Sequence, residues 1–234
     1  ALAGANADGL RAAIGSMDPA LRGDLEWLVR TMPAPDLASV TGDFLARNVR
    51  LAARARDGAP WGRDLPPELF RQYVLPYANL NERRDDWRQD FFDRFSAGAW
   101  KFKDPIDAVR WINDRLMADC KVGFDWTKRI KTEQSPYETM QVGWASCTGV
   151  SILLVDACRA VGIPARIAGI PAWTQATGNH NWVEVWWDRW YNVPEAGKDP
   201  RQPDWVREQC RTQAKADDWV HAVYAATWSP TGTH

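Results

Sequence analysis

The feature that most constrains the fold is a nearly unbroken apolar run, residues 150–161, that directly follows a stretch of small residues around Cys147. A run of this length without alternation is typical of a helix that is buried on all sides. It ends at Gly162, and Pro164 prevents its continuation. Cys147 is therefore predicted in the first turn of a core helix, where free backbone N–H groups and the helix dipole favour a thiolate.

The histidines of the chain narrow the choice of a base for this thiol, because there are only three: His180, His221 and His234. His180 opens a run of β-branched and aromatic residues, 181–187, that is typical of a strand. A neutral imidazole within reach of Cys147 would accept its proton and leave a thiolate and imidazolium pair. His221 precedes a short apolar run and is interpreted as a structural histidine.

A third catalytic residue is expected after a second β-like run, residues 189–193. Glu195 is the nearest downstream acid that a returning strand would bring beside His180. In that position it would orient the imidazole, as the acid of a catalytic triad does. The predicted catalytic residues are therefore Cys147, His180 and Glu195.

Three motifs in this order resemble the core of the transglutaminase-like superfamily. They are Cys-Thr-Gly at 147–149, Gly-Ile-Pro-Ala-Arg at 162–166 and His-Asn-Trp-Val-Glu-Val-Trp at 180–186. Together they are far more specific than any one of them. Other segments are similar to one bacterial branch of that superfamily: 75–83, 135–138 and 231–234.

The resemblance implies an α+β, papain-like fold, in which the cysteine lies on a helix packed against an antiparallel sheet that carries the histidine and the acid. It also implies acyl transfer, deamidation or hydrolysis at amide bonds, with no metal or organic cofactor. The sequence departs from the family where an acid commonly closes the last strand, because Pro194 stands there and Glu195 follows. Asn192, as the neutral amide of papain-like enzymes, and Asp199 are therefore alternatives to Glu195.

Acyl transfer also requires hydrogen-bond donors for the oxyanion of its intermediate. The backbone N–H of Cys147 is available by its position at the helix start. Gln141 lies six residues upstream, at the spacing that papain-like enzymes use for a side-chain donor. Gln134 and Trp144 are the alternatives for this second donor.

Composition limits the partners of the chain. Its 234 residues are 45% hydrophobic and 25% charged, which fits one domain with a sizeable core. The formal net charge of −1 gives no global field to attract nucleic acid or an anionic membrane. No apolar run reaches the roughly 18 residues that a membrane span needs. We expect a peptide or protein substrate, with no nucleic-acid or membrane partner, and the sequence does not indicate the oligomeric state.

The expected organisation is a single transglutaminase-like domain over 1–234, with a mainly helical extension at 1–120 and the catalytic core at 121–234. The helices predicted from apolar spacing are 21–31, 40–55 and 105–119, the last one capped by Asp104. The predicted strands are 165–170, 181–187 and 189–193. Segment 121–142 lacks clear periodicity and is expected to loop past the cleft.

Several other side chains receive structural interpretations. Cys158 is expected to be a buried neighbour on the cysteine helix. Glu184 is expected to pair with Arg166 in a neighbouring strand. The charged run 82–88 is interpreted as a solvated helix face, with a brace for the sheet or cleft wall as the alternative. Trp173 either covers the substrate channel or anchors its loop.

Two hypotheses about function follow. The first is a thiol-dependent enzyme that hydrolyses, deamidates or transfers acyl groups from amide or peptide bonds. The alternative is a non-catalytic module of the same fold that binds a peptide or glycan in a tryptophan-lined cleft. The chain begins with Ala1 rather than Met, which fits either a trimmed sequence or the remnant of an exported precursor. The sequence therefore leaves the location open, with a periplasmic or extracellular location as one expectation.

Overall fold

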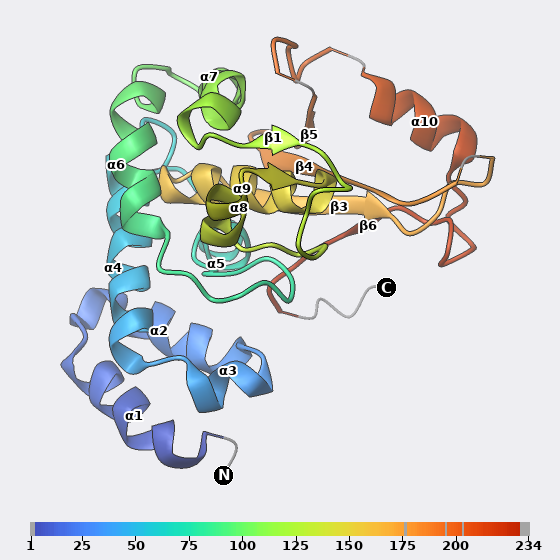
Figure 1. Cartoon of the computed structure of the whole chain (residues 1–234). Coiled ribbons are helices and arrows are strands. Elements are labelled where there is room, and N and C mark those ends of the chain that lie inside the picture. The colour runs from blue at the N-terminus through green and yellow to red at the C-terminus, as the bar shows by residue number, and fades with distance from the viewer. Residues whose placement is uncertain (1–2, 176, 195, 203, 230–234) are drawn as a thin grey trace.

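The computed structural model of the chain describes residues 3–175, 177–194, 196–202 and 204–229 (Figure 1). Helices fill the first half, and strands alternate with helices in the second. The elements of the first half are η1 (Gly4–Asn6), α1 (Ala7–Ser16), α2 (Pro19–Thr31), α3 (Ala34–Ser39), α4 (Gly42–Gly58), α5 (Pro67–Tyr73), α6 (Arg88–Ala99) and α7 (Pro105–Asp119). Those of the second half are β1 (Gly123–Phe124), α8 (Pro136–Val142), β2 (Trp144–Ala145), α9 (Cys147–Ala160), β3 (Ala165–Ile170), β4 (His180–Trp186), β5 (Trp190–Val193), α10 (Trp205–Gln213) and β6 (Tyr224–Ala225).

The helix α7 begins with the capping residue that the sequence predicts. Asp104 caps α7, because its carboxylate accepts hydrogen bonds from the N–H groups of Ile106 and Asp107 at 2.9 and 3.0 Å. The predicted helices correspond to α2, α4 and α7, while α1, α3, α5 and α6 lie outside the predicted ranges. Among the described residues, none of the helices combines the length and apolarity that crossing a bilayer requires.

The main sheet is antiparallel, with the strand order β5-β4-β3-β6. Ile170 at the end of β3 lies opposite His180 at the start of β4. On the other side of β4, the last residue of β5, Val193, lies opposite Val183. Residues 180–182 therefore extend beyond the end of β5, and this end of β4 is not covered by a strand on that side.

The two faces of the sheet are covered by different helices. The face that carries Val183 and Val185 shares the central hydrophobic core with α9. The other face carries Trp182, against which Val206 and Cys210 of α10 pack. In Figure 1, α9 runs along the strands, while α1, α2 and α3 gather at the opposite end of the molecule from α10. The predicted α+β arrangement, a cysteine-bearing helix packed on an antiparallel sheet, is confirmed.

The prediction of a loop over residues 121–142 was correct for residues 125–135 and wrong for the elements on either side of them. Gly123–Phe124 forms the strand β1, which pairs in parallel with β2. The helix α8 begins with a capping box, in which the Ser135 hydroxyl accepts from the N–H of Glu138 and the Glu138 carboxylate accepts from the N–H of Ser135. This reciprocal cap stabilises a helix too short to show a periodic apolar pattern.

The prediction that the charged run 82–88 forms a solvated helix face was also wrong. Glu82, Asp85 and Arg88 are only 3%, 7% and 2% exposed. The Glu82 carboxylate accepts hydrogen bonds from the N–H groups of Asn79 and Leu80. These charges are buried because backbone groups of neighbouring segments replace the water that would otherwise solvate them.

The remaining structural interpretations agree with the structure. Arg166 and Glu184 lie opposite each other in β3 and β4 and form an ion pair at 2.7 Å. Cys158 is fully buried in the central core. The Nδ1 atom of His221 lies 2.8 Å from the carbonyl oxygen of Ala172, as expected for a structural histidine. Trp173 is buried, which identifies it as a loop anchor.

Candidate active site

Cys147 is the first residue of α9 and is partly exposed. The preceding residue, Ser146, occupies the N-cap position, but its side chain makes no capping hydrogen bond. Its hydroxyl is buried without a partner among the described residues. No N-cap side chain therefore occupies the first-turn N–H groups, which leaves them free to bind a thiolate or a substrate oxygen.

A cavity of about 400 Å³ opens beside Cys147, and His180 lines it as well. It extends along one face of α9, past Val150 and Leu154. Both Trp182 and its neighbour Val183 line it, although their side chains alternate across β4. The cavity reaches both faces of β4 because β5 does not extend to this end of the strand.

His180 is partly buried among aromatic rings. Its ring is stacked on Trp182, with the centroids 6.1 Å apart, and meets the edge of Trp205 at 5.3 Å. Burial lowers the pKa of the His180 imidazole, and the negative charge of Asp204 acts in the opposite direction. Because burial dominates, the imidazole is in the neutral form that can accept a proton.

Cys147 and His180 share the cavity but approach it from different sides. The α9 helix packs on the face of β4 that carries Val183, whereas His180 shares the opposite face with Trp182. The structure contains no hydrogen bond between Cys147 Sγ and the His180 ring. The two side chains are related only because both line the cavity. In unliganded enzymes such contacts are often long and tighten when substrate binds.

The three residues predicted as candidates for the group that orients His180 lie in different surroundings. Glu195 lies outside the described residues. Asp199 accepts a hydrogen bond from the N–H of Arg201 at 2.9 Å and does not line the cavity. Asn192 donates from Nδ2 to the carboxylate of Asp204. The structure therefore brings neither Asp199 nor Asn192 directly to the imidazole of His180.

Asp204 is an acidic residue at the cavity that the sequence analysis did not single out. It lines the same cavity as Cys147 and His180. It is held in place from two sides, by the amide of Asn192 and by the N–H of Arg207, which donates to Asp204 Oδ1 at 2.9 Å. The local sequence indicates only its role as the N-cap of α10 and gives no sign of its position at the cavity.

None of the predicted side-chain donors for the oxyanion lines the cavity. Gln134 is fully buried, and its Nε2 donates to the carbonyl of Trp144 at 3.1 Å. Gln141 is exposed on α8. The Trp144 ring instead lies under the ammonium of Lys128, 3.9 Å from its centroid. The uncapped backbone N–H groups at the start of α9 remain as donors beside Cys147.

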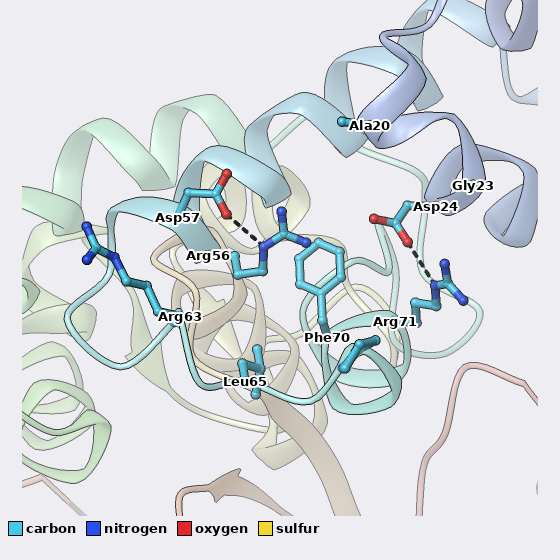
Figure 2. Close-up of a pocket in the computed structure, with 11 residues that line it drawn as sticks. Ala20, Gly23, Asp24, Arg56, Asp57, Arg63, Leu65, Phe70 and Arg71 are labelled. Atoms are coloured by element: carbon cyan, nitrogen blue, oxygen red, sulfur yellow. Dashed lines mark hydrogen bonds and ion pairs between the residues drawn. The ribbon is translucent and has the colours of Figure 1, made fainter.

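A second cavity, of about 500 Å³, lies beside α2, α4 and α5 (Figure 2). Its charged groups are largely paired, Arg56 with Asp57 and Arg71 with Asp24, both at 2.8 Å. Its lining contains no cysteine or histidine, so it offers no thiol nucleophile. Within the described part of the chain, no three His, Cys, Asp or Glu side chains are grouped so that they could hold a metal ion.

The site thus defines a class of protein: an α+β fold with a cysteine at the start of a helix, a histidine on the adjoining antiparallel sheet and a cavity between them. Residues 96–194 match the family model of the transglutaminase-like superfamily. The match includes Cys147 and His180 and ends before Glu195, α10 and β6.

Among solved structures, the chain is similar to the crystal structure of a candidate cysteine protease from Cytophaga hutchinsonii. The sequence identity is 17% and the TM-score is 0.45. The similarity covers 70% of this chain and 54% of the other, so this chain spans about half the length of that protein. A comparison with curated protein sequences found no match.

Proposed function

We propose that this protein is a thiol-dependent enzyme that cleaves amide or peptide bonds, with Cys147 as the nucleophile and His180 as its base. The observation that carries the proposal is that both side chains line one cavity at the start of α9, where no side chain caps the helix. The match of residues 96–194 to a superfamily that includes thiol-dependent peptidases and transferases supports it.

The proposed reaction begins when His180 accepts the Cys147 proton. The thiolate attacks the amide carbonyl carbon, and the oxygen of the tetrahedral intermediate is bound by N–H groups at the start of α9. The C–N bond breaks as the imidazolium returns its proton to the leaving amine, and a thioester remains. A water molecule, deprotonated by the imidazole, then attacks the thioester and regenerates the thiol.

Water is favoured over an amine as the second acceptor because the cavity is open. Phe124 and Trp205, which line it, are 59% and 52% exposed. Efficient transfer to an amine requires a site that keeps water away from the thioester. The proposal is therefore a hydrolase, and transfer is the competing outcome.

The reactivity of the thiol tests the proposal without knowledge of the natural substrate. Iodoacetamide at mildly acidic pH is expected to label Cys147 faster than Cys120, Cys158 or Cys210, because only Cys147 combines a helix start with a base. His180→Ala should slow this labelling about tenfold or more, and the matched control His221→Ala should not. Equal labelling of accessible thiols, or no effect of His180→Ala, contradicts the proposal.

The acid that orients His180 is proposed to be Asp204. Removing its charge in Asp204→Asn lowers the pKa of the imidazole further, so the thiolate and imidazolium pair forms at higher pH. Labelling of Cys147 at mildly acidic pH should fall about three- to tenfold. Glu195→Gln is the comparison variant. If Glu195→Gln slows labelling and Asp204→Asn does not, the role returns to Glu195.

The exposed aromatic rings at the cavity also fit the alternative of a binding module. Intact-mass analysis after incubation with activated amide or ester acyl donors separates the two. The enzyme proposal predicts an acyl adduct on Cys147 that is lost to water, and its absence in Cys147→Ala. A protein that binds peptides equally well as Cys147→Ala and forms no adduct supports the binding module.

A further inference from the structure

Three side chains form a continuous line of hydrogen bonds across the sheet and into α9. Tyr224, on β6, donates from its hydroxyl to Asn181 Oδ1. Asn181, on β4, donates from Nδ2 to the hydroxyl oxygen of Thr148, on α9, at 2.7 Å. The two inner members directly follow the proposed catalytic residues in the chain, Thr148 after Cys147 and Asn181 after His180.

The inner part of this line is buried, with Thr148 and Asn181 only 2% and 6% exposed. A buried amide that loses one partner cannot replace it with bulk water, so each bond holds its two elements in a defined position. The Asn181 side chain lies on the α9 face of β4. It therefore connects α9 and β4 at the residues that directly follow Cys147 and His180 in the chain.

Gly169 makes room for the outer bond of the line. It pairs with Asn181 on one side of β3 and with Tyr224 on the other. A Cβ atom at position 169 would overlap Asn181 Oδ1 and would lie 2.6 Å from the Tyr224 hydroxyl oxygen. The bond between Tyr224 and Asn181 thus passes directly over a residue that has no side chain.

Tyr224 lies within electrostatic range of the proposed nucleophile. Partial burial, followed by the negative charges of Cys147 and Glu133, raises the pKa of the Tyr224 phenol. A phenol that keeps its proton remains a donor to Asn181 while the thiolate is present. Tyr224 therefore still donates its hydrogen bond to Asn181 when Cys147 is a thiolate.

We infer that Tyr224, Asn181 and Thr148 are positioning residues that fix the start of α9 against β4 and so hold the Cys147 thiol where His180 can deprotonate it. This role deepens the proposed function and rests on it. None of the three residues forms or breaks a bond in the reaction. Tyr224 lies beyond the segment that matches the superfamily model, so this part of the site is contributed by the C-terminal region of the chain.

The pH profile of Cys147 alkylation tests this role, because a purely structural contribution would not change it. Tyr224→Phe and Thr148→Val each remove one hydroxyl from the line. Both are expected to shift the profile to higher pH and to slow alkylation at mildly acidic pH about three- to tenfold. Thr148→Ser keeps the hydroxyl and should restore a profile close to that of the wild type.

The matched control is Tyr191→Phe, because Tyr191 lies in the same sheet but its hydroxyl bonds to Asp188, away from the line. It should leave the profile unchanged. Gly169→Ala, which inserts a methyl group under the bond between Tyr224 and Asn181, is expected to act like Tyr224→Phe. If Gly169→Ala does not fold, Tyr224→Phe and Thr148→Val alone test the positioning role.

The outcomes separate this inference from the proposed function. If wild-type Cys147 is no more reactive than the other cysteines, the proposed function itself fails. If wild-type Cys147 is reactive but Tyr224→Phe and Thr148→Val, folded by circular dichroism, keep the wild-type profile, only the positioning role is overturned. A shift in both variants with recovery in Thr148→Ser supports it.

Discussion

The most unusual single residue away from the site is Asp156, which is fully buried on α9. Its Oδ1 accepts a hydrogen bond from Asn79 Nδ2 at 2.9 Å. Its Oδ2 and the amide oxygen of Asn79 are both buried acceptors without a donor among the described residues. Burial, followed by the charge of Glu82, raises the pKa of Asp156 well above its ordinary value of 3.8. A proton on Oδ2 would give the Asp156 side chain a hydrogen-bond donor, and we therefore expect Asp156 to be protonated in the folded state.

The protonation of Asp156 predicts the effect of Asp156→Asn. The folded state keeps a proton that the unfolded state releases, so this group stabilises the fold at low pH and its contribution is lost as pH rises through the raised pKa. The amide of an asparagine at position 156 supplies an N–H donor at every pH, because it does not need to bind a proton first. Asp156→Asn should raise the free energy of unfolding by about 1 to 3 kcal/mol at neutral pH, and the gain should shrink as pH falls toward 4.

Urea unfolding at several pH values measures this difference. The matched control is Asp85→Asn, because the buried Asp85 carboxylate accepts from the N–H of Tyr137 and pairs with Arg83. That variant should lose stability at neutral pH. An Asp156→Asn protein that is less stable than the wild type at neutral pH shows that Asp156 is ionised in the fold.

Among the secondary-structure elements, long helices and helices with a capping residue are the ones that the sequence predicts best. The nearly unbroken apolar run 150–161 and the cap at Asp104 predicted α9 and α7 because both signals are local. The position of Asp204 beside His180 was not predictable in this way, because it depends on where the connection after β5 leads. The number of residues between two positions does not give their distance in space across such a connection, and the sequence therefore favours the nearer acid, Glu195.

Helix α8 has a local signal in the sequence at its start. Ser135, Pro136 and Glu138 have the spacing of a capping box with proline in the first turn. Such a cap specifies a helix start even where the helix is too short for an apolar stripe. Periodicity alone therefore missed an element that capping chemistry identifies.

The same cap gives a prediction at this scale. Ser135 is fully buried, and its hydroxyl accepts from the N–H of Glu138. Ser135→Ala should lower the free energy of unfolding by about 0.5 to 2 kcal/mol, because a helix N–H loses its acceptor. Ser16→Ala, at the exposed end of α1, is the control and should change stability by less than about 0.5 kcal/mol. Denaturant unfolding compares both, and equal effects would rule out the capping role.

At the scale of the whole molecule, Arg88 joins the helical half to the central core. Its Nε donates to Asn48 Oδ1 on α4, and its Nη1 donates to the carbonyl of Arg159 on α9. Its Nη2 donates to the carbonyls of residues 74–76, at 2.8 to 3.2 Å. One guanidinium thus satisfies backbone groups from segments far apart in the chain. The charged run 82–88 gave no sign of this burial, because the acceptors lie in those distant segments.

Burial lowers the pKa of Arg88 to about 9, so the guanidinium still carries its charge at neutral pH. Arg88→Met keeps much of the side-chain volume but leaves several buried carbonyls without donors. It should lower the free energy of unfolding by about 3 to 5 kcal/mol. The control Arg30→Met removes an exposed guanidinium that pairs with Glu26 on the same helix, and it should cost less than about 1 kcal/mol. Guanidinium chloride unfolding followed by circular dichroism measures both variants. Equal losses would mean that the hydrogen bonds of Arg88 contribute no more than a surface ion pair, and that apolar packing alone joins the two halves.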